Sequence, residues 1–289
     1  MAFKHPQYLV DTDWLAGHLN DSDIRVLDCT AFNRSDGSGG VRAVSGRDSW
    51  AKEHIPGSVH ADLVNDLSDK SASFRYMMPP AEQFADAMSS YGVGAGTRTV
   101  LYDSTSGSWA TRIWWMLRAF GFDDAFILNG GLHKWKSEGR PVTTDPSTYP
   151  PAVFRAKPRA GLIADKSEVL AALGQESTCV LNALSEEQHI GTGGANYGRP
   201  GRIADSVNVP AGDLMDPITH AYLTPEELAK RFAQVGVDAA ERVIAYCGGG
   251  IAASNDAFIL TLLGYENVAV YDASMSEWAA DASLPMQTG

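Results

Sequence analysis

The residues best suited to chemistry lie in one stretch, residues 243–254, where Cys247 separates an apolar run from three consecutive glycines. The apolar run predicts a buried strand that carries the cysteine to its carboxyl end, where open α/β sheets place ligand sites. The glycines allow main-chain N–H groups to turn toward the sulfur as an anion-binding nest, and the helix predicted after them adds the positive end of its dipole. Such surroundings favour the thiolate, so the pattern predicts a nucleophile. The predicted anion-binding loop comprises Gly248, Gly249, Gly250, Ile251 and Ala252.

The alternative interpretation of Cys247 is a small core side chain, because free cysteine is among the most buried residue types. Cys29 and Cys179 lie in or beside predicted strands without a glycine loop, so we interpret both as structural thiols. Three cysteines without paired spacing predict neither a disulfide framework nor a zinc site, and they favour a reducing compartment, the cytoplasm. His54 and His60 have no companion at metal-ligand spacing, so no metal is expected.

The composition is that of a globular protein, with 44% hydrophobic and 20% charged residues in a chain of 289. No apolar run approaches the roughly 20 residues of a membrane span, and the first residues lack the apolar core of a signal peptide. The formal net charge is −12, which disfavours nucleic acid and anionic membranes as partners. An anionic substrate must therefore be attracted locally.

The chain contains two copies of one sequence pattern. Tyr102 and Asp103 of the first copy correspond to Tyr246 and Cys247 of the second. Further matches join residues 26–28 to 180–182, 54–59 to 202–207, 117–124 to 260–267 and 129–135 to 272–278. The difference in residue number between matched positions changes along the chain, which we interpret as loop insertion, mostly between residues 33 and 48. Each copy has a size common for a single domain.

Each copy alternates short apolar strands with helical stretches, which predicts a mainly parallel sheet flanked by helices in each α/β domain. The predicted strands cover residues 25–28, 99–102, 125–128, 179–181, 242–246 and 268–271, and the predicted helices cover 49–53, 80–91, 109–120 and 132–137. Thr224 opens a further helix with a capping box, and this helix ends near Gly236. We divide the chain into a first domain (1–140), a linker with a proline-rich start (141–160) and a second domain (161–289).

The two copies differ at the residue that follows the central strand. The first copy has Asp103 there, followed by a longer loop that is poorer in glycine. The first domain is therefore predicted to be catalytically inactive. It is expected to form one side of a site centred on Cys247, in the cleft between the domains.

These motifs resemble the tandem rhodanese-type sulfurtransferases, the family that includes thiosulfate and 3-mercaptopyruvate sulfurtransferases. The resemblance rests on His-Ile-Pro-Gly at residues 54–57, the runs 78–84 and 112–121, the loop 247–251, and Tyr271-Asp272 followed by Glu277-Trp278. It implies two rhodanese-like domains and a double displacement without a cofactor. The Cys247 thiolate takes a sulfane sulfur from a small donor, becomes a persulfide and passes the sulfur to a thiol or cyanide, with a thioredoxin-like reductant as a further candidate partner.

The resemblance also implies donor-binding arginines, for which Arg199 and Arg202 are the best candidates, because family members place such arginines in this segment. Trp109 and Phe32 are candidates to line the domain cleft. The alternatives are solvated surface arginines and aromatic rings that only pack.

The loop departs from both donor subclasses of the family. Thiosulfate-preferring members carry a basic pair where this chain has Gly248 and Gly249. Mercaptopyruvate-preferring members often have a serine at the position of Gly249, joined by an Asp and a His that correspond to Val64 and Tyr76. The serine relay is therefore absent. The neutral loop is still closer to the mercaptopyruvate type, so we expect 3-mercaptopyruvate to be favoured over thiosulfate.

Two other functions were weighed. A phosphatase of this fold needs an arginine six residues after the cysteine to clamp phosphate, and this chain has Ala253 there. A non-catalytic or protein-directed persulfide carrier or binding module remains open as the alternative to an enzyme.

Overall fold

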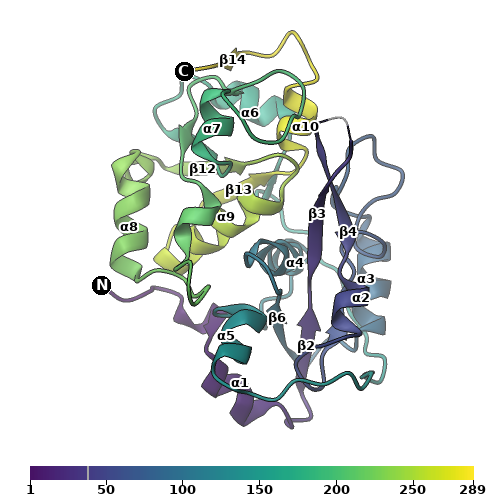
Figure 1. The fold of residues 1–289 in the computed structure, drawn as a ribbon. Helices are drawn as coiled ribbons and strands as arrows, with labels where there is room; N and C mark the ends of the chain where they lie inside the picture. The colour runs from purple at the N-terminus through teal and green to yellow at the C-terminus, as the bar shows by residue number, and fades with distance from the viewer. Residues whose placement is uncertain (38) are drawn as a thin grey trace.

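The computed structural model describes residues 1–37 and 39–289, which form two α/β units built on the same plan (Figure 1). The strands of the N-terminal sheet are β1 (Leu9–Val10), β2 (Ile24–Asp28), β5 (Val59–His60), β6 (Arg98–Tyr102) and β7 (Ala125–Leu128). The strands of the C-terminal sheet are β8 (Ile163–Ala164), β9 (Thr178–Asn182), β11 (Val207–Asn208), β12 (Arg242–Tyr246) and β13 (Val268–Tyr271). The spatial orders β1-β7-β6-β2-β5 and β8-β13-β12-β9-β11 match strand for strand, and every pair is parallel. The prediction of two mainly parallel α/β domains is confirmed.

Helices flank both sheets. They are α1 (Thr12–His18), α2 (Arg47–Trp50), α3 (Ala81–Ser90), α4 (Ser108–Ala119), α5 (Gly131–Ser137), α6 (Lys166–Ala172), α7 (Glu186–Ile190), α8 (Pro225–Gln234), α9 (Ile251–Leu263) and α10 (Ser274–Trp278), with short 3₁₀ turns η1 (Pro6–Tyr8), η2 (Ala211–Leu214) and η3 (Val237–Ala239). The predicted helices all occur, with ends shifted by a few residues. The capping box at Thr224 is present: its side chain accepts the N–H of Glu227, whose carboxylate accepts the N–H of Thr224.

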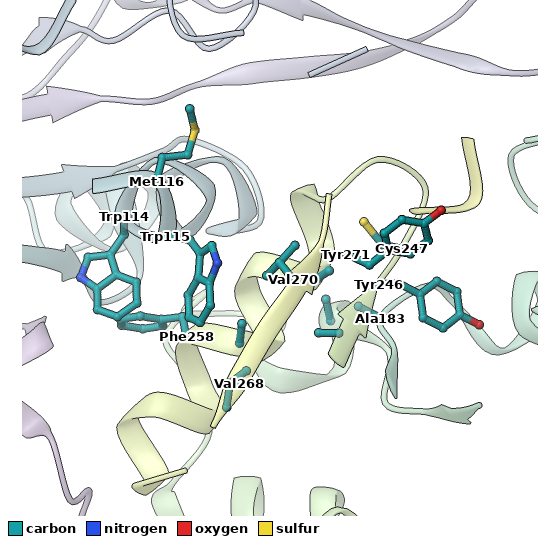
Figure 2. Close-up of a cluster of buried hydrophobic side chains, with 14 of the residues drawn as sticks. Trp114, Trp115, Met116, Ala183, Tyr246, Cys247, Phe258, Val268, Val270 and Tyr271 are labelled. Atoms are coloured by element: carbon teal, nitrogen blue, oxygen red, sulfur yellow. The ribbon is translucent and has the colours of Figure 1, made fainter. Parts of the chain in front are cut away.

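The two units join through their central helices, α4 and α9. Nearly every residue of both helices is buried, as expected for helices that are apolar around most of their circumference. The rings of Trp114 and Phe258 meet edge to face with centroids 4.8 Å apart. Figure 2 shows these rings at one end of a buried cluster that has Tyr246 and Cys247 at its other end. The central helices therefore fix the position of the cysteine loop relative to the N-terminal unit.

The insertion between residues 33 and 48 was expected to be a loop, and this expectation is wrong. β3 (Ala31–Ser35) pairs antiparallel with β4 (Val41–Ser45) as a long hairpin that reaches toward the C-terminal unit (Figure 1). The N–H of Asn196 donates to the carbonyl of Gly39 at the hairpin's tip, over 3.1 Å. The hairpin was missed because only Ala31 and Ala43 among its strand residues are buried, so its sequence lacks the apolar alternation of a half-buried strand.

The segment 141–160 packs along the N-terminal unit. The hydroxyl of Tyr149 accepts the N–H of Val26 over 3.0 Å, and Phe154 is buried against the ring of Phe84. This segment has almost no regular secondary structure.

Each unit extends a loop over the strand ends of the other. The N–H of Met78 donates to Asp272 Oδ2 over 2.7 Å, and the N–H of Tyr222 donates to Asn129 Oδ1 over 2.9 Å. The cysteine loop of the C-terminal unit is therefore covered by residues of the N-terminal unit. Across residues 1–37 and 39–289, none of the helices has the length and apolar character needed to span a bilayer.

Candidate active site

Cys247 lies between the last residue of β12 and the first turn of α9, as predicted (Figure 2). Its side chain is 2% exposed. Its N–H donates to Ser274 Oγ over 3.0 Å, and its carbonyl accepts the N–H of Met275 over 3.0 Å. The main chain of the cysteine is thus held by the start of α10.

The glycines after Cys247 meet different constraints. The carbonyl of Gly248 accepts both the N–H and the hydroxyl of Ser276, over 3.0 and 2.6 Å. Gly250 is the N-cap of α9 with φ 78°, in the left-handed region that favours glycine. A Cβ at Gly250 would lie 2.9 Å from the carbonyl oxygen of Asp272, whereas a Cβ at Gly249 would meet nothing closer than 3.8 Å.

This difference predicts a contrast between two matched substitutions. Gly250→Ala should lower kcat/KM by roughly 10²-fold, because the strained backbone and the clash with Asp272 move the loop by a fraction of an ångström or more. Gly249→Ala should stay within about threefold of the wild type, since its Cβ would only come into ordinary van der Waals contact, with no atom closer than 3.8 Å. Steady-state kinetics on both variants, with thermal unfolding to check the fold, measures the contrast. Equal losses in the two variants would contradict it.

The corresponding loop of the N-terminal unit already holds an anion, the carboxylate of Asp103. Its oxygens accept four main-chain N–H groups, those of Thr105 (2.7 Å) and of Gly107, Trp109 and Ala110 (3.1 Å each). Gly107 is the N-cap of α4 with φ 73°, matching Gly250 at the start of α9. This loop-and-helix arrangement therefore stabilises negative charge on the residue that ends the strand.

A cavity of about 610 Å³ lies over the cysteine, between the two units. Both units contribute to its lining, which is rich in hydroxyl, amide and aromatic side chains. Within the described part of the chain, its only basic lining residue is Arg75 and its only acidic one is Asp36.

The structure brings part of the predicted site together. Cys247, Trp109 and the loop residues Gly248, Gly249, Ile251 and Ala252 line the cavity, with Gly250 directly beneath. Phe32 is not part of the lining, although its neighbour Asn33 is. The ring of Phe32 instead lies against the guanidinium of Arg34, at 5.4 Å.

Arg199 and Arg202 lie outside this lining. The Arg199 guanidinium donates to the main-chain carbonyls of Trp278, Ala279, Asp281 and Leu284. Arg202 donates to the carbonyl of Gly289 over 2.6 Å. The reason is a pairing between distant segments, because β10 (Arg202–Ile203) forms an antiparallel pair with β14 (Met286–Gln287), which draws both side chains to the last residues of the chain.

Sequence reasoning missed Tyr197 as a cavity residue, and it considered Tyr76 only as the residue at the position of the relay histidine; both line the cavity. Burial and the charge of Cys247 raise the pKa of Tyr197, so its hydroxyl stays protonated and can donate toward an anion. The Tyr197 ring packs directly against Gly248: a Cβ added at Gly248 would lie 2.1 Å from Cζ of the ring. Tyr76 has φ 64° and accepts the N–H of Ala43. Aromatic character alone did not identify Tyr197, since most aromatic side chains only pack, whereas the correspondence of Tyr76 to the relay histidine could have placed it at the site.

Beneath the loop lies an ion pair between the units that the sequence did not indicate. Arg112 of α4 is fully buried, and its Nη2 donates to Asp272 Oδ1 and to the carbonyl of Tyr76. A Cβ at Gly250 would lie 3.0 Å from Arg112 Nη1. The pair therefore lies against the cysteine loop at Gly250, and neither of its residues lines the cavity.

No metal-ligand cluster of three or more His, Cys, Asp or Glu side chains occurs among residues 1–37 and 39–289. The groups at the site include the thiol of Cys247, main-chain N–H donors of its loop, the hydroxyl and amide side chains of the lining, and the charged side chains of Arg75 and Asp36.

Comparison with known proteins gives a consistent picture. A family model described as a rhodanese-like domain matches residues 11–138 and 166–281. The chain is 32% identical to a probable 3-mercaptopyruvate sulfurtransferase of Pseudomonas aeruginosa, covering 97% of this chain and 98% of the relative. It is 34% identical to thiosulfate sulfurtransferase of Mus musculus, covering 93% and 91%. The crystal structure of the 3-mercaptopyruvate sulfotransferase SseA from Escherichia coli superposes with a TM-score of 0.78 at 29% identity, covering 92% of this chain and 98% of SseA.

Proposed function

Because the chain belongs to the rhodanese family and is a sulfurtransferase, we propose that Cys247 is its sulfur-carrying nucleophile and that 3-mercaptopyruvate is its preferred donor over thiosulfate. The buried thiol at the end of β12, before the N-terminus of α9, supports the first part. The neutral loop after the cysteine supports the second.

The proposed reaction is a double displacement. The Cys247 thiolate attacks the sulfur of 3-mercaptopyruvate, the carbon–sulfur bond breaks, and the electron pair stays on the carbon. That carbon takes the proton of the donor thiol, so pyruvate leaves and Cys247 becomes a persulfide anion. An acceptor thiol then attacks the outer sulfur and gives a new persulfide plus the free thiolate, while cyanide gives thiocyanate. A thioredoxin-like reductant could supply the acceptor thiol of this second step. The three free cysteines are compatible with a reducing compartment, the cytoplasm.

The observation that carries this proposal is the Asp103 carboxylate in the equivalent loop. Four main-chain N–H groups surround that anion. With the two N-caps aligned, the N–H groups that correspond to those of Gly107, Trp109 and Ala110 belong to Gly250, Ala252 and Ala253. A persulfide anion on Cys247 would occupy the equivalent place and gain these three donors.

The same comparison assigns the roles of the two units. In our proposal residues 1–140 form a catalytically inactive domain, because a carboxylate fills its nest, and residues 161–289 form the active one. Residues 141–160 connect them. The inactive domain contributes Trp109, Tyr76 and Arg75 to the cavity wall.

The donor assignment is tested by steady-state sulfur transfer to a thiol acceptor. We expect kcat/KM for 3-mercaptopyruvate to exceed that for thiosulfate by at least about tenfold, because no basic pair follows the cysteine to bind a dianion. The reverse order would overturn the donor assignment. A donor-derived sulfur on Cys247 without turnover to any small acceptor would instead favour a protein-directed carrier.

A further inference from the structure

The loop of the N-terminal unit gives its anion a side-chain donor as well as main-chain donors. Besides the four main-chain N–H groups, Asp103 Oδ1 accepts the hydroxyl of Thr105 over 2.9 Å. With the N-caps Gly107 and Gly250 aligned, Thr105 corresponds to Gly248. Residues 248–250 are all glycine, so this part of the cysteine loop has no hydroxyl of its own.

A hydroxyl from another segment lies at the position of the missing side chain. A Cβ added at Gly248 would lie 2.2 Å from the hydroxyl oxygen of Tyr197 and 2.1 Å from its Cζ. The phenol therefore occupies the space that any side chain at residue 248 would need. Tyr197 and Cys247 line the same cavity, so an anion on the cysteine faces the space beside this phenol.

The phenol of Tyr197 is suited to donate a hydrogen bond. Burial and the negative charge of Cys247 raise the pKa of Tyr197, so the hydroxyl keeps its proton at neutral pH. A hydrogen bond with the side chain of Gln188, which also lines the cavity, acts on this pKa in the opposite direction. An amide that donates to the phenol oxygen leaves the O–H group available for an anion.

Tyr197 and the cysteine loop are anchored to the same helix, α10. Two residues after Tyr197, the Arg199 guanidinium donates to main-chain carbonyls in and after α10, those of Trp278, Ala279, Asp281 and Leu284. Ser274 and Ser276 of α10 bond to the main chain of the cysteine loop. The phenol is therefore held in a fixed position relative to Cys247.

We infer that Tyr197 is a catalytic residue whose phenol donates a hydrogen bond to the outer sulfur of the Cys247 persulfide, an inference that rests on the function proposed above. The outer sulfur lies about 2.05 Å beyond Sγ, in the cavity that both residues line. Tyr197 thus does for the persulfide what Thr105 does for the Asp103 carboxylate.

The phenol keeps its proton through the reaction. When an acceptor thiolate attacks the outer sulfur, the S–S bond to Cys247 breaks and its electron pair returns to Sγ. The hydrogen bond from Tyr197 is released with the transferred sulfur. Its effect is to stabilise the persulfide anion until an acceptor arrives.

The test measures the equilibrium of sulfur exchange with glutathione persulfide and glutathione at a set ratio. The Cys247 thiolate takes the outer sulfur and releases the glutathione thiolate, and intact mass gives the fraction of protein that carries the sulfur. The variants are Tyr197→Phe, Gly248→Ala, their double variant and the control Tyr265→Phe, all in a Cys179→Ser background. Phenylalanine keeps the ring and removes only the hydroxyl, and Tyr265 is a half-buried tyrosine outside the cavity lining.

Tyr197→Phe should lower the equilibrium constant for persulfide formation about 10- to 100-fold, the effect of losing a hydrogen bond to a charged group. Gly248→Ala should also lower it, because the new Cβ displaces the phenol. The double variant should lose no more than about twofold beyond the larger single loss, since both changes remove the same hydrogen bond. Tyr265→Phe should match the wild type. An unchanged constant in Tyr197→Phe, or losses that add in the double variant, would overturn the inference.

The same experiment separates this inference from the proposed function. Neither 3-mercaptopyruvate nor thiosulfate takes part in the exchange, so its result does not depend on the donor assignment. A persulfide that is equally stable in the wild type and in Tyr197→Phe would sink the inference alone. Absence of any added sulfur on Cys247 of the wild type would sink the proposed function and the inference together.

Discussion

Replacing Cys247 by serine is expected to lower kcat/KM for sulfur transfer from 3-mercaptopyruvate by at least about 10³-fold. A hydroxyl is a far weaker nucleophile than a thiolate and cannot form a persulfide. The fold should persist, since serine is close to cysteine in size and the loop is tied by main-chain bonds to Ser274 and Ser276. Steady-state kinetics with pyruvate release as the readout measures the loss.

The matched control is Cys179→Ser. Burial raises the pKa of Cys179 to about 11, so this thiol stays protonated at neutral pH, and it lies on β9, outside the lining of the cavity. Its substitution should leave kcat/KM within about threefold of the wild type. Comparable losses in Cys179→Ser and Cys247→Ser would contradict the assignment of the nucleophile.

Arg112→Met is expected to lower the free energy of unfolding by about 3–5 kcal/mol, the cost of leaving a buried charge without its partner. Asp272 is 3% exposed, and among the described residues its carboxylate would keep only the N–H of Met78 as a donor. Methionine fills much of the volume of the arginine stem, so the loss comes mainly from the charge. Denaturant unfolding with a linear extrapolation measures it.

Two comparisons make this stability prediction specific. The exposed pair Arg159–Asp123 has a similar contact, with nitrogen and oxygen 2.6 Å apart and side chains 38% and 45% exposed. Arg159→Met should change the free energy of unfolding by less than about 1 kcal/mol, because water screens the pair. The double variant Arg112→Met with Asp272→Asn should recover part of the loss, since the uncompensated charge is gone. Equal effects of Arg112→Met and Arg159→Met would refute a buried electrostatic role.

The repeat, the strand pattern and the cysteine loop could be predicted because local sequence determines them. Residues 243–246 of β12 are apolar and buried, and Gly250 after them has the positive φ that the turn from strand to helix requires. The two sheets have the same strand order, as duplicated units should.

The rest depends on contacts between distant segments, which leave little trace in local sequence. Arg199 and Arg202 were expected at the donor site, yet their guanidinium groups bind the carbonyls of a segment some 80 residues later. The hairpin β3–β4 was missed because its exposed strands are stabilised by pairing and by the opposite unit, and not by an apolar face.

The central claim is that sulfur passes through a persulfide on Cys247, and intact mass spectrometry tests it most directly. The wild-type protein is treated with 3-mercaptopyruvate in the absence of an acceptor, desalted and weighed beside Cys247→Ser and Cys179→Ser. A gain of one sulfur atom in wild type and Cys179→Ser, absent in Cys247→Ser and removed by cyanide with release of thiocyanate, is the predicted result. No gain in the wild type, or an undiminished gain in Cys247→Ser, would contradict it.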